Sequence, residues 1–163
     1  MRRIATIAVV ATAGAAGAAG LAAWAMSGGQ QKRLGQLIPY EDAQAVALGE
    51  AIYADHCAAC HGAELEGQVP DWRSPDAAGL LPAPPHDETG HTWHHADALL
   101  IDITTRGTEA VVGRGYRSNM MGFGDVLTED EILAALAFIK STWPGEVVEI
   151  HNRINADSVT FSN

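Results

Sequence analysis

Cysteine is scarce in this chain, with only two among 163 residues. Both lie in one C-x-x-C-H sequence at residues 57–61. A structural zinc site needs four ligands, and no further cysteines or histidines follow at the spacing of such a site. A thioredoxin-like redox pair requires a strand–helix–strand context, which the sequence also lacks. A simple disulfide is the remaining alternative, and it leaves the adjacent histidine unexplained.

The C-x-x-C-H sequence contains every group needed to attach haem covalently. The thiols of Cys57 and Cys60 can each form a thioether to a haem vinyl group, while the imidazole of His61 binds the iron from one face. The sequence therefore predicts one covalent haem c, bound by Cys57, Cys60 and His61.

Positive charge is also scarce. The chain has ten lysines and arginines against 20 aspartates and glutamates, and its formal net charge is −10. This balance argues against nucleic acid as a partner, because phosphate binding requires clustered basic residues. An acidic surface instead suits weak, salt-sensitive docking to basic patches on other proteins.

Charge is absent from one long segment near the N-terminus. Arg2 and Arg3 precede 23 uncharged residues, Ile4 to Met26, which predict an export signal. As a helix this segment would span about 34 Å, enough to cross a hydrocarbon core of about 30 Å. Ala23-Trp24-Ala25 offers a cleavage site, so the segment is either cleaved or retained. We expect a retained membrane anchor, which places the rest of the chain on the periplasmic side of the inner membrane. Cleavage would leave the protein soluble in the periplasm.

The remainder of the chain predicts an all-α domain. Apolar residues recur at helical spacing in three segments, and glycine- and proline-rich loops, including residues 64–92 and 107–124, separate them. The third segment begins with a capping box of Thr128 and Glu131. The predicted helices are residues 41–55, which lead into the C-x-x-C-H sequence, 96–106, which end at Gly107, and 128–143, which end before Pro144.

Composition sets the expected boundaries of this domain. The segment before it is polar and rich in glycine and glutamine, as in a linker. The segment after it has weak periodicity, which predicts a tail that wraps or frays. The predicted organisation is a signal peptide or anchor at 1–26, a linker at 27–39, the domain at 40–144 and a C-terminal tail at 145–163.

Residues 40–144 resemble a class I cytochrome c of the bacterial monohaem type. Members of that family show a methionine, then Pro-x-Phe, then a capped terminal helix, and the matching run here begins Met120-Met121-Gly122-Phe123. The resemblance implies that a helical domain wraps around one haem and that Met120 is the second iron ligand. Met121 stands where the family has proline, so it remains an alternative ligand.

The resemblance also implies how the domain is packed. The family places a glycine and an aromatic residue of the first helix against an aromatic residue of the last helix; here these are Gly49, Tyr53 and Phe138. A proline carbonyl accepts a hydrogen bond from the ligating histidine. The candidates for that proline are Pro82, Pro84 and Pro85.

Four histidines lie close together in the sequence, namely His86, His91, His94 and His95. Such a cluster could form a copper or zinc site or supply a replacement iron ligand. We expect instead that residues 92–95 pack near the haem edge. His56 and His151 are expected to be exposed.

The resemblance implies a one-electron carrier that passes electrons between redox partner proteins and performs no bond-making chemistry of its own. An iron bound by imidazole and thioether keeps both ligands in both oxidation states, so little reorganisation accompanies electron transfer. The alternatives from other classes are a haem subunit of a periplasmic oxidoreductase, a haem-based sensor of small ligands and a copper-binding module.

Overall fold

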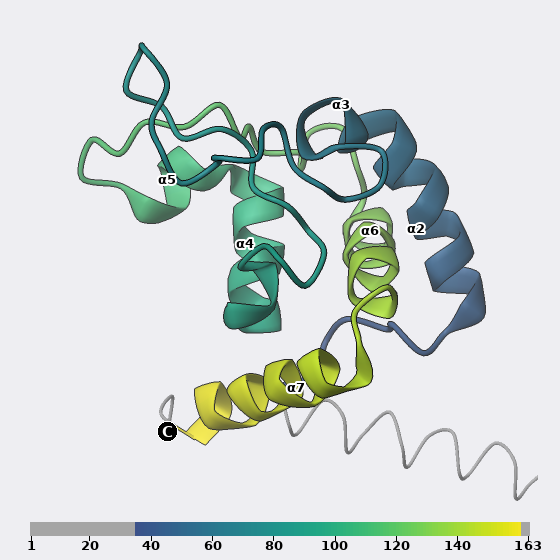
Figure 1. Ribbon diagram of the computed structural model, residues 1–163. Coiled ribbons are helices and arrows are strands. Elements are labelled where there is room, and N and C mark those ends of the chain that lie inside the picture. The colour runs from purple at the N-terminus through teal and green to yellow at the C-terminus, as the bar shows by residue number, and fades with distance from the viewer. Residues whose placement is uncertain (1–34, 161–163) are drawn as a thin grey trace, which may run out of the picture.

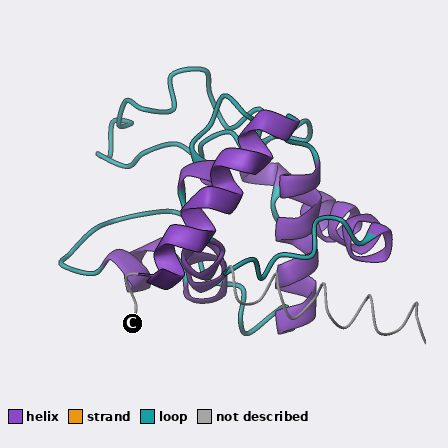
Figure 2. Cartoon of the chain, turned by 90° about the horizontal axis from the view of Figure 1, so that it is seen from below, coloured by secondary structure: helices purple, strands orange, loops and turns teal. Residues whose placement is uncertain are grey.

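The structure is a computed structural model that describes residues 35–160. These residues form an all-α fold without strands, which confirms the predicted fold class (Figures 1 and 2). The predicted signal or anchor helix at residues 1–26 lies outside the described residues. From residue 35 to residue 160, no helix has the length and apolar character needed to cross a membrane.

The three long helices predicted from sequence are present, each within two residues of the expected ends. The prediction of a wholly irregular segment at 107–124 is wrong for five residues, which form a short helix. The helices are α2 (Ala43–His56), α3 (Ala58–His61), η1 (Thr92–His94, a 3₁₀ helix), α4 (Asp97–Arg106), α5 (Thr108–Val112), α6 (Glu129–Ser141) and α7 (Gly145–Thr160).

Polar side chains determine where α2 and α6 begin. The carboxylate of Asp42 accepts hydrogen bonds from the first backbone N–H groups of α2. At the start of α6, Thr128 Oγ1 accepts from the Glu131 backbone N–H while the Glu131 carboxylate accepts from the Thr128 backbone N–H. The predicted capping box is therefore present. Helix α4 ends at Gly107, whose φ of +86° favours glycine.

Helix α2 packs closely against α6 at Gly49 (Figure 1). A methyl group at this position would lie 1.9 Å from the carbonyl oxygen of Ala134, so the contact requires glycine. One turn further along α2, the ring of Tyr53 contacts the ring of Phe138 with 5.4 Å between centroids. The predicted packing of Gly49 and Tyr53 on α2 against α6, with Phe138 as the aromatic residue of α6, is confirmed.

Residues 145–160 do not fray, as the sequence allowed, but form the regular helix α7 packed on the domain. The buried residues of this helix are Val147, His151 and Asn155, each four residues apart and thus on one face. Because two of these three are polar, the face has little apolar periodicity. His151 is fully buried, so the prediction that it is exposed is wrong.

Four fully buried polar side chains hold α7 in place, and we call them the Asp97 cluster: Asp97, Lys140, His151 and Asn155. The carboxylate of Asp97 accepts a hydrogen bond of 2.8 Å from Asn155 Nδ2, and Lys140 Nζ lies 3.9 Å from it. The same carboxylate accepts the backbone N–H groups of Leu37 and Ile38 at 2.6 and 3.0 Å. The cluster therefore joins the segment before α2 to α4, α6 and α7.

We predict that Gly49→Ala lowers the free energy of unfolding by about 1–3 kcal/mol, because the new methyl group forces α2 away from α6. Urea unfolding of the haem-loaded protein measures the change. The matched control is Gly145→Ala, where a methyl group meets no atom within 4 Å. Equal stability of the two variants would show that the α2–α6 contact does not require glycine.

We predict that His151 makes stability depend on pH. Its Nε2 donates to the His95 carbonyl at 2.8 Å and lies 3.3 Å from Asp97. Burial, and next the charge of Lys140, lower the pKa of His151 from 6.5 to about 4. The unfolded chain therefore binds this proton at a higher pH than the folded chain. Stability is fully present above pH 6.5 and falls as the pH drops towards 4.

His151→Gln should flatten this fall in stability, measured as the difference in unfolding free energy between pH 7 and pH 4.5 in urea titrations. His56→Gln, which alters an exposed histidine, should retain the wild-type slope. A His151→Gln protein with the wild-type slope would show that another group is responsible.

Candidate functional site

One turn of helix brings the C-x-x-C-H residues together. The carbonyl of Cys57 accepts hydrogen bonds from the backbone N–H groups of Cys60 and His61, which forms α3 directly after α2. Both thiols are free; that of Cys57 is half-buried and that of Cys60 is exposed. Burial, and next the neighbouring Cys60, raise the pKa of the Cys57 thiol to about 11.

The side chain of His61 is only 6% exposed. Its Nδ1 lies 2.8 Å from the carbonyl oxygen of Pro84. Because a carbonyl only accepts, Nδ1 carries the proton, and the lone pair of Nε2 is left for a metal. Burial lowers the pKa of His61, against the opposing effect of the Pro84 hydrogen bond, and so favours the neutral form that binds iron. Of the three candidate prolines, Pro84 makes the contact.

Close backbone contacts bring Pro84 to this position despite its distance from His61 in the sequence. The Gly67 N–H donates to the His61 carbonyl at 2.7 Å, and the Gln68 N–H donates to the Ala83 carbonyl. Beyond Pro84, a methyl group on Gly90 would lie 1.9 Å from the carbonyl oxygen of Pro85, so the return of the loop requires glycine there. The loop is irregular, as predicted, but it is tightly folded against α3.

The two methionines lie in a loop that pairs with the end of α4. The carbonyl of Met120 accepts the Thr108 N–H, and Met121 forms an isolated bridge with Gly107. A methyl group on Gly122 would lie 2.6 Å from the Arg106 carbonyl carbon, so glycine allows this approach. The side chain of Met120 is partly buried, whereas that of Met121 is 67% exposed.

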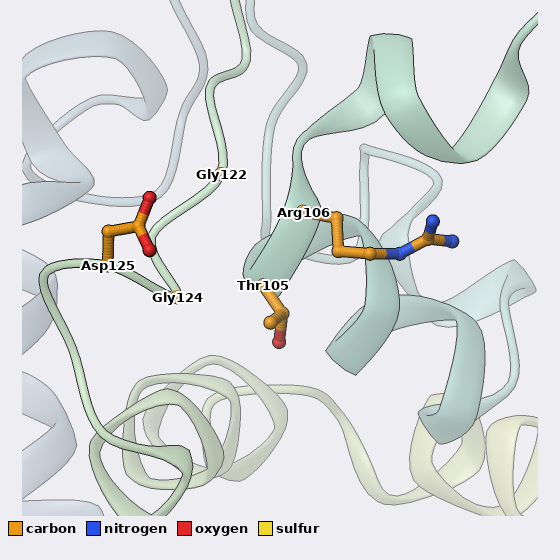
Figure 3. A pocket seen from close by; sticks show the side chains of 5 residues that line it. All are labelled: Thr105, Arg106, Gly122, Gly124 and Asp125. Atoms are coloured by element: carbon orange, nitrogen blue, oxygen red, sulfur yellow. The ribbon is translucent and has the colours of Figure 1, made fainter.

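Two hollows flank this loop. The first, of about 490 Å³, is lined by Thr105, Arg106, Gly122, Gly124 and Asp125 (Figure 3). In that view the Arg106 side chain extends away from Asp125, and its guanidinium pairs with Asp102. The second, of about 530 Å³, is lined by residues that include both methionines. None of the described residues lining either hollow belongs to the C-x-x-C-H sequence.

The four clustered histidines do not form a metal centre of their own. Between residues 35 and 160, no three or more His, Cys, Asp or Glu side chains are grouped so that they could hold a metal ion. The ring of His91 stacks on Trp72 with 5.1 Å between centroids and meets His95 edge-on at 5.2 Å.

His86 occupies a position that the sequence does not indicate. Its ring stacks on that of His61, with 3.9 Å between centroids and 20° between planes. In the sequence, only its place two residues after Pro84 points to this contact, and only because Pro84 is the hydrogen-bond acceptor of His61.

The donor set fits haem c. Two free thiols lie within one helical turn of a buried imidazole whose Nε2 is available, and a partly buried thioether lies on a separate loop. Imidazole nitrogen and thioether sulfur are axial ligands that haem iron takes in electron carriers.

The sequence matches the family model for cytochrome c over residues 46–143, which is more than half of the chain. The protein therefore belongs to the cytochrome c family. Neither the characterised proteins nor the solved structures gave a match. Membership, together with a single C-x-x-C-H sequence, means that the protein carries one covalent haem c and transfers electrons to and from redox partners.

We predict that replacing both Cys57 and Cys60 by alanine yields a largely unfolded protein without covalent haem, because the porphyrin supplies much of the apolar core. Mass spectrometry after denaturation measures attachment, and circular dichroism measures folding. Ala59→Ser, between the two cysteines and exposed, should retain the haem. Covalent haem in the double variant would contradict the assignment.

Proposed function

We propose that the protein is a one-electron carrier on the periplasmic side of the inner membrane, with His61 and Met120 as the axial ligands of its haem. The observation that carries this proposal is the state of His61. Its imidazole is buried, its Nδ1 is bonded to Pro84, and its Nε2 is free to bind iron.

The bound haem supplies a one-electron iron couple, and the protein determines how that couple is used. A protein ligand on each face leaves no open position for a substrate. A thioether ligand raises the reduction potential relative to a second imidazole. Both effects suit a carrier better than an enzyme.

Burial supports Met120 over Met121 as the second ligand. A ligand must turn away from solvent towards the interior, and 67% exposure of Met121 leaves its sulfur largely in water. Glycines allow the close contact between this loop and the end of α4 on both sides, Gly122 in the loop and Gly107 at the helix end, and this contact supports the register of the methionines.

The proposed partners are redox proteins with basic docking patches, in keeping with the formal charge of −10. We propose that the N-terminal segment at 1–26 anchors the protein to the membrane. A tether of this kind raises the effective concentration of the carrier beside membrane-bound partners.

We predict that Met120→Ala abolishes the sulfur-to-iron absorption band of the oxidised protein, lowers the reduction potential and lets added ligands bind the iron, because His61 is then the only strong protein ligand. Met121→Ala, the matched control, should do little. Absorption spectroscopy and potentiometry measure these changes.

Other outcomes have definite meanings. If Met121→Ala removes the band and Met120→Ala does not, the ligand is Met121. If the unaltered protein lacks the band and neither variant changes its spectrum, a histidine from the 86–95 segment becomes the leading ligand. A five-coordinate, high-spin spectrum of the unaltered protein would contradict the carrier and favour an oxidoreductase subunit or a ligand sensor.

A further inference from the structure

The unexpected neighbour of His61 is a second imidazole that lies flat against it. The rings of His61 and His86 are 3.9 Å apart at their centroids and nearly parallel, with 20° between planes. Offset-stacked aromatic rings attract one another beyond simple burial. This contact acts on the face of the His61 ring, whereas the Pro84 hydrogen bond acts at its edge.

The two contacts restrict different motions of the His61 ring. A single hydrogen bond at Nδ1 restrains the ring at one atom, and it tolerates some rotation of the ring plane about the Cβ–Cγ bond. A flat neighbour opposes that rotation, because turning the ring drives its edge into the partner.

His86 is itself firmly held by elements outside α3. Its Nδ1 lies 2.8 Å from Thr92 Oγ1, and its backbone N–H donates to the Leu65 carbonyl at 2.8 Å. Its carbonyl accepts the indole N–H of Trp143, two residues after α6, at 2.7 Å. Thr92, Leu65 and Trp143 are all buried. The stacking ring is thus supported by buried residues of the loop and of the segment just after α6.

We propose that His86 is a positioning residue that fixes the plane of the His61 imidazole above the haem through ring stacking. The plane of an axial imidazole sets the orientation of the iron orbitals that hold the unpaired electron of the ferric state, and outer contacts of this kind tune a metal centre. The proposal rests on the proposed role of His61 as an iron ligand.

The test is proton NMR of the oxidised, haem-loaded full chain. The paramagnetic shifts of the haem methyl groups depend on the plane of the axial imidazole, so a fixed ring spreads them and a rotating ring averages them. We expect His86→Leu to narrow the range of the haem methyl shifts and to shift the reduction potential. His86→Phe retains a stacking ring and should keep the wild-type spread.

His94→Leu serves as the control, because this exposed histidine packs on Trp93 and makes no ring contact with His61. An unchanged spread in His86→Leu would overturn the proposal, and so would equal narrowing in His86→Phe and His86→Leu. If His86→Leu fails to retain haem, Thr92→Val replaces it. That variant removes the hydrogen bond that orients His86, and an unchanged spread there would overturn the proposal.

The unaltered protein separates this proposal from the proposed function. With ¹⁵N-labelled histidine, strongly shifted ring signals of His61, assigned by comparison with the His86 variants, show that it binds iron. Their absence contradicts the proposed function. Their presence, with a spread that does not respond to His86→Leu, overturns the role of His86 alone.

Discussion

The contact between α2 and α6 determines where His61 and the ring stacked on it lie. Gly49 lets the two backbones approach, and α2 then runs directly into α3 with its thiols and imidazole. Trp143, two residues after the end of α6, donates a hydrogen bond to the carbonyl of His86. The α2–α6 pair thus leads directly to His61 at the end of α3. Through the Trp143 hydrogen bond it also holds His86, whose ring stacks on His61. A shift between these helices would move His61, the proposed iron ligand, relative to His86.

Features that depend on neighbouring residues could be predicted from the sequence. The C-x-x-C-H sequence, the Thr128 capping box and the glycine that ends α4 are all local patterns, and each is present. The packing at Gly49 came from the resemblance to the family. The choice of Pro84 and the stacking of His86 could not be predicted, because both depend on the path of a long irregular loop across the molecule.

Helix α7 was missed for a different reason. Amphipathic patterns reveal helices whose buried face is apolar, but α7 turns His151 and Asn155 inwards. Their shared partner, Asp97, lies on another helix and is far away in the sequence. Burying these groups costs solvation energy that the ion pair and hydrogen bonds offset only when all partners are in place. The Asp97 cluster therefore contributes specificity of docking as much as stability.

The Asp97 cluster also has a mechanical consequence. Asp97 binds the backbone N–H groups of Leu37 and Ile38 and the side chain of Asn155. Its three partners all lie outside the segment matched by the cytochrome c family. Tension applied to the chain ahead of residue 37 would enter the domain at the first residue of α4. The load would pass into α4 and α7 before it reached α2, so the haem-bearing turn would be shielded from pulling forces.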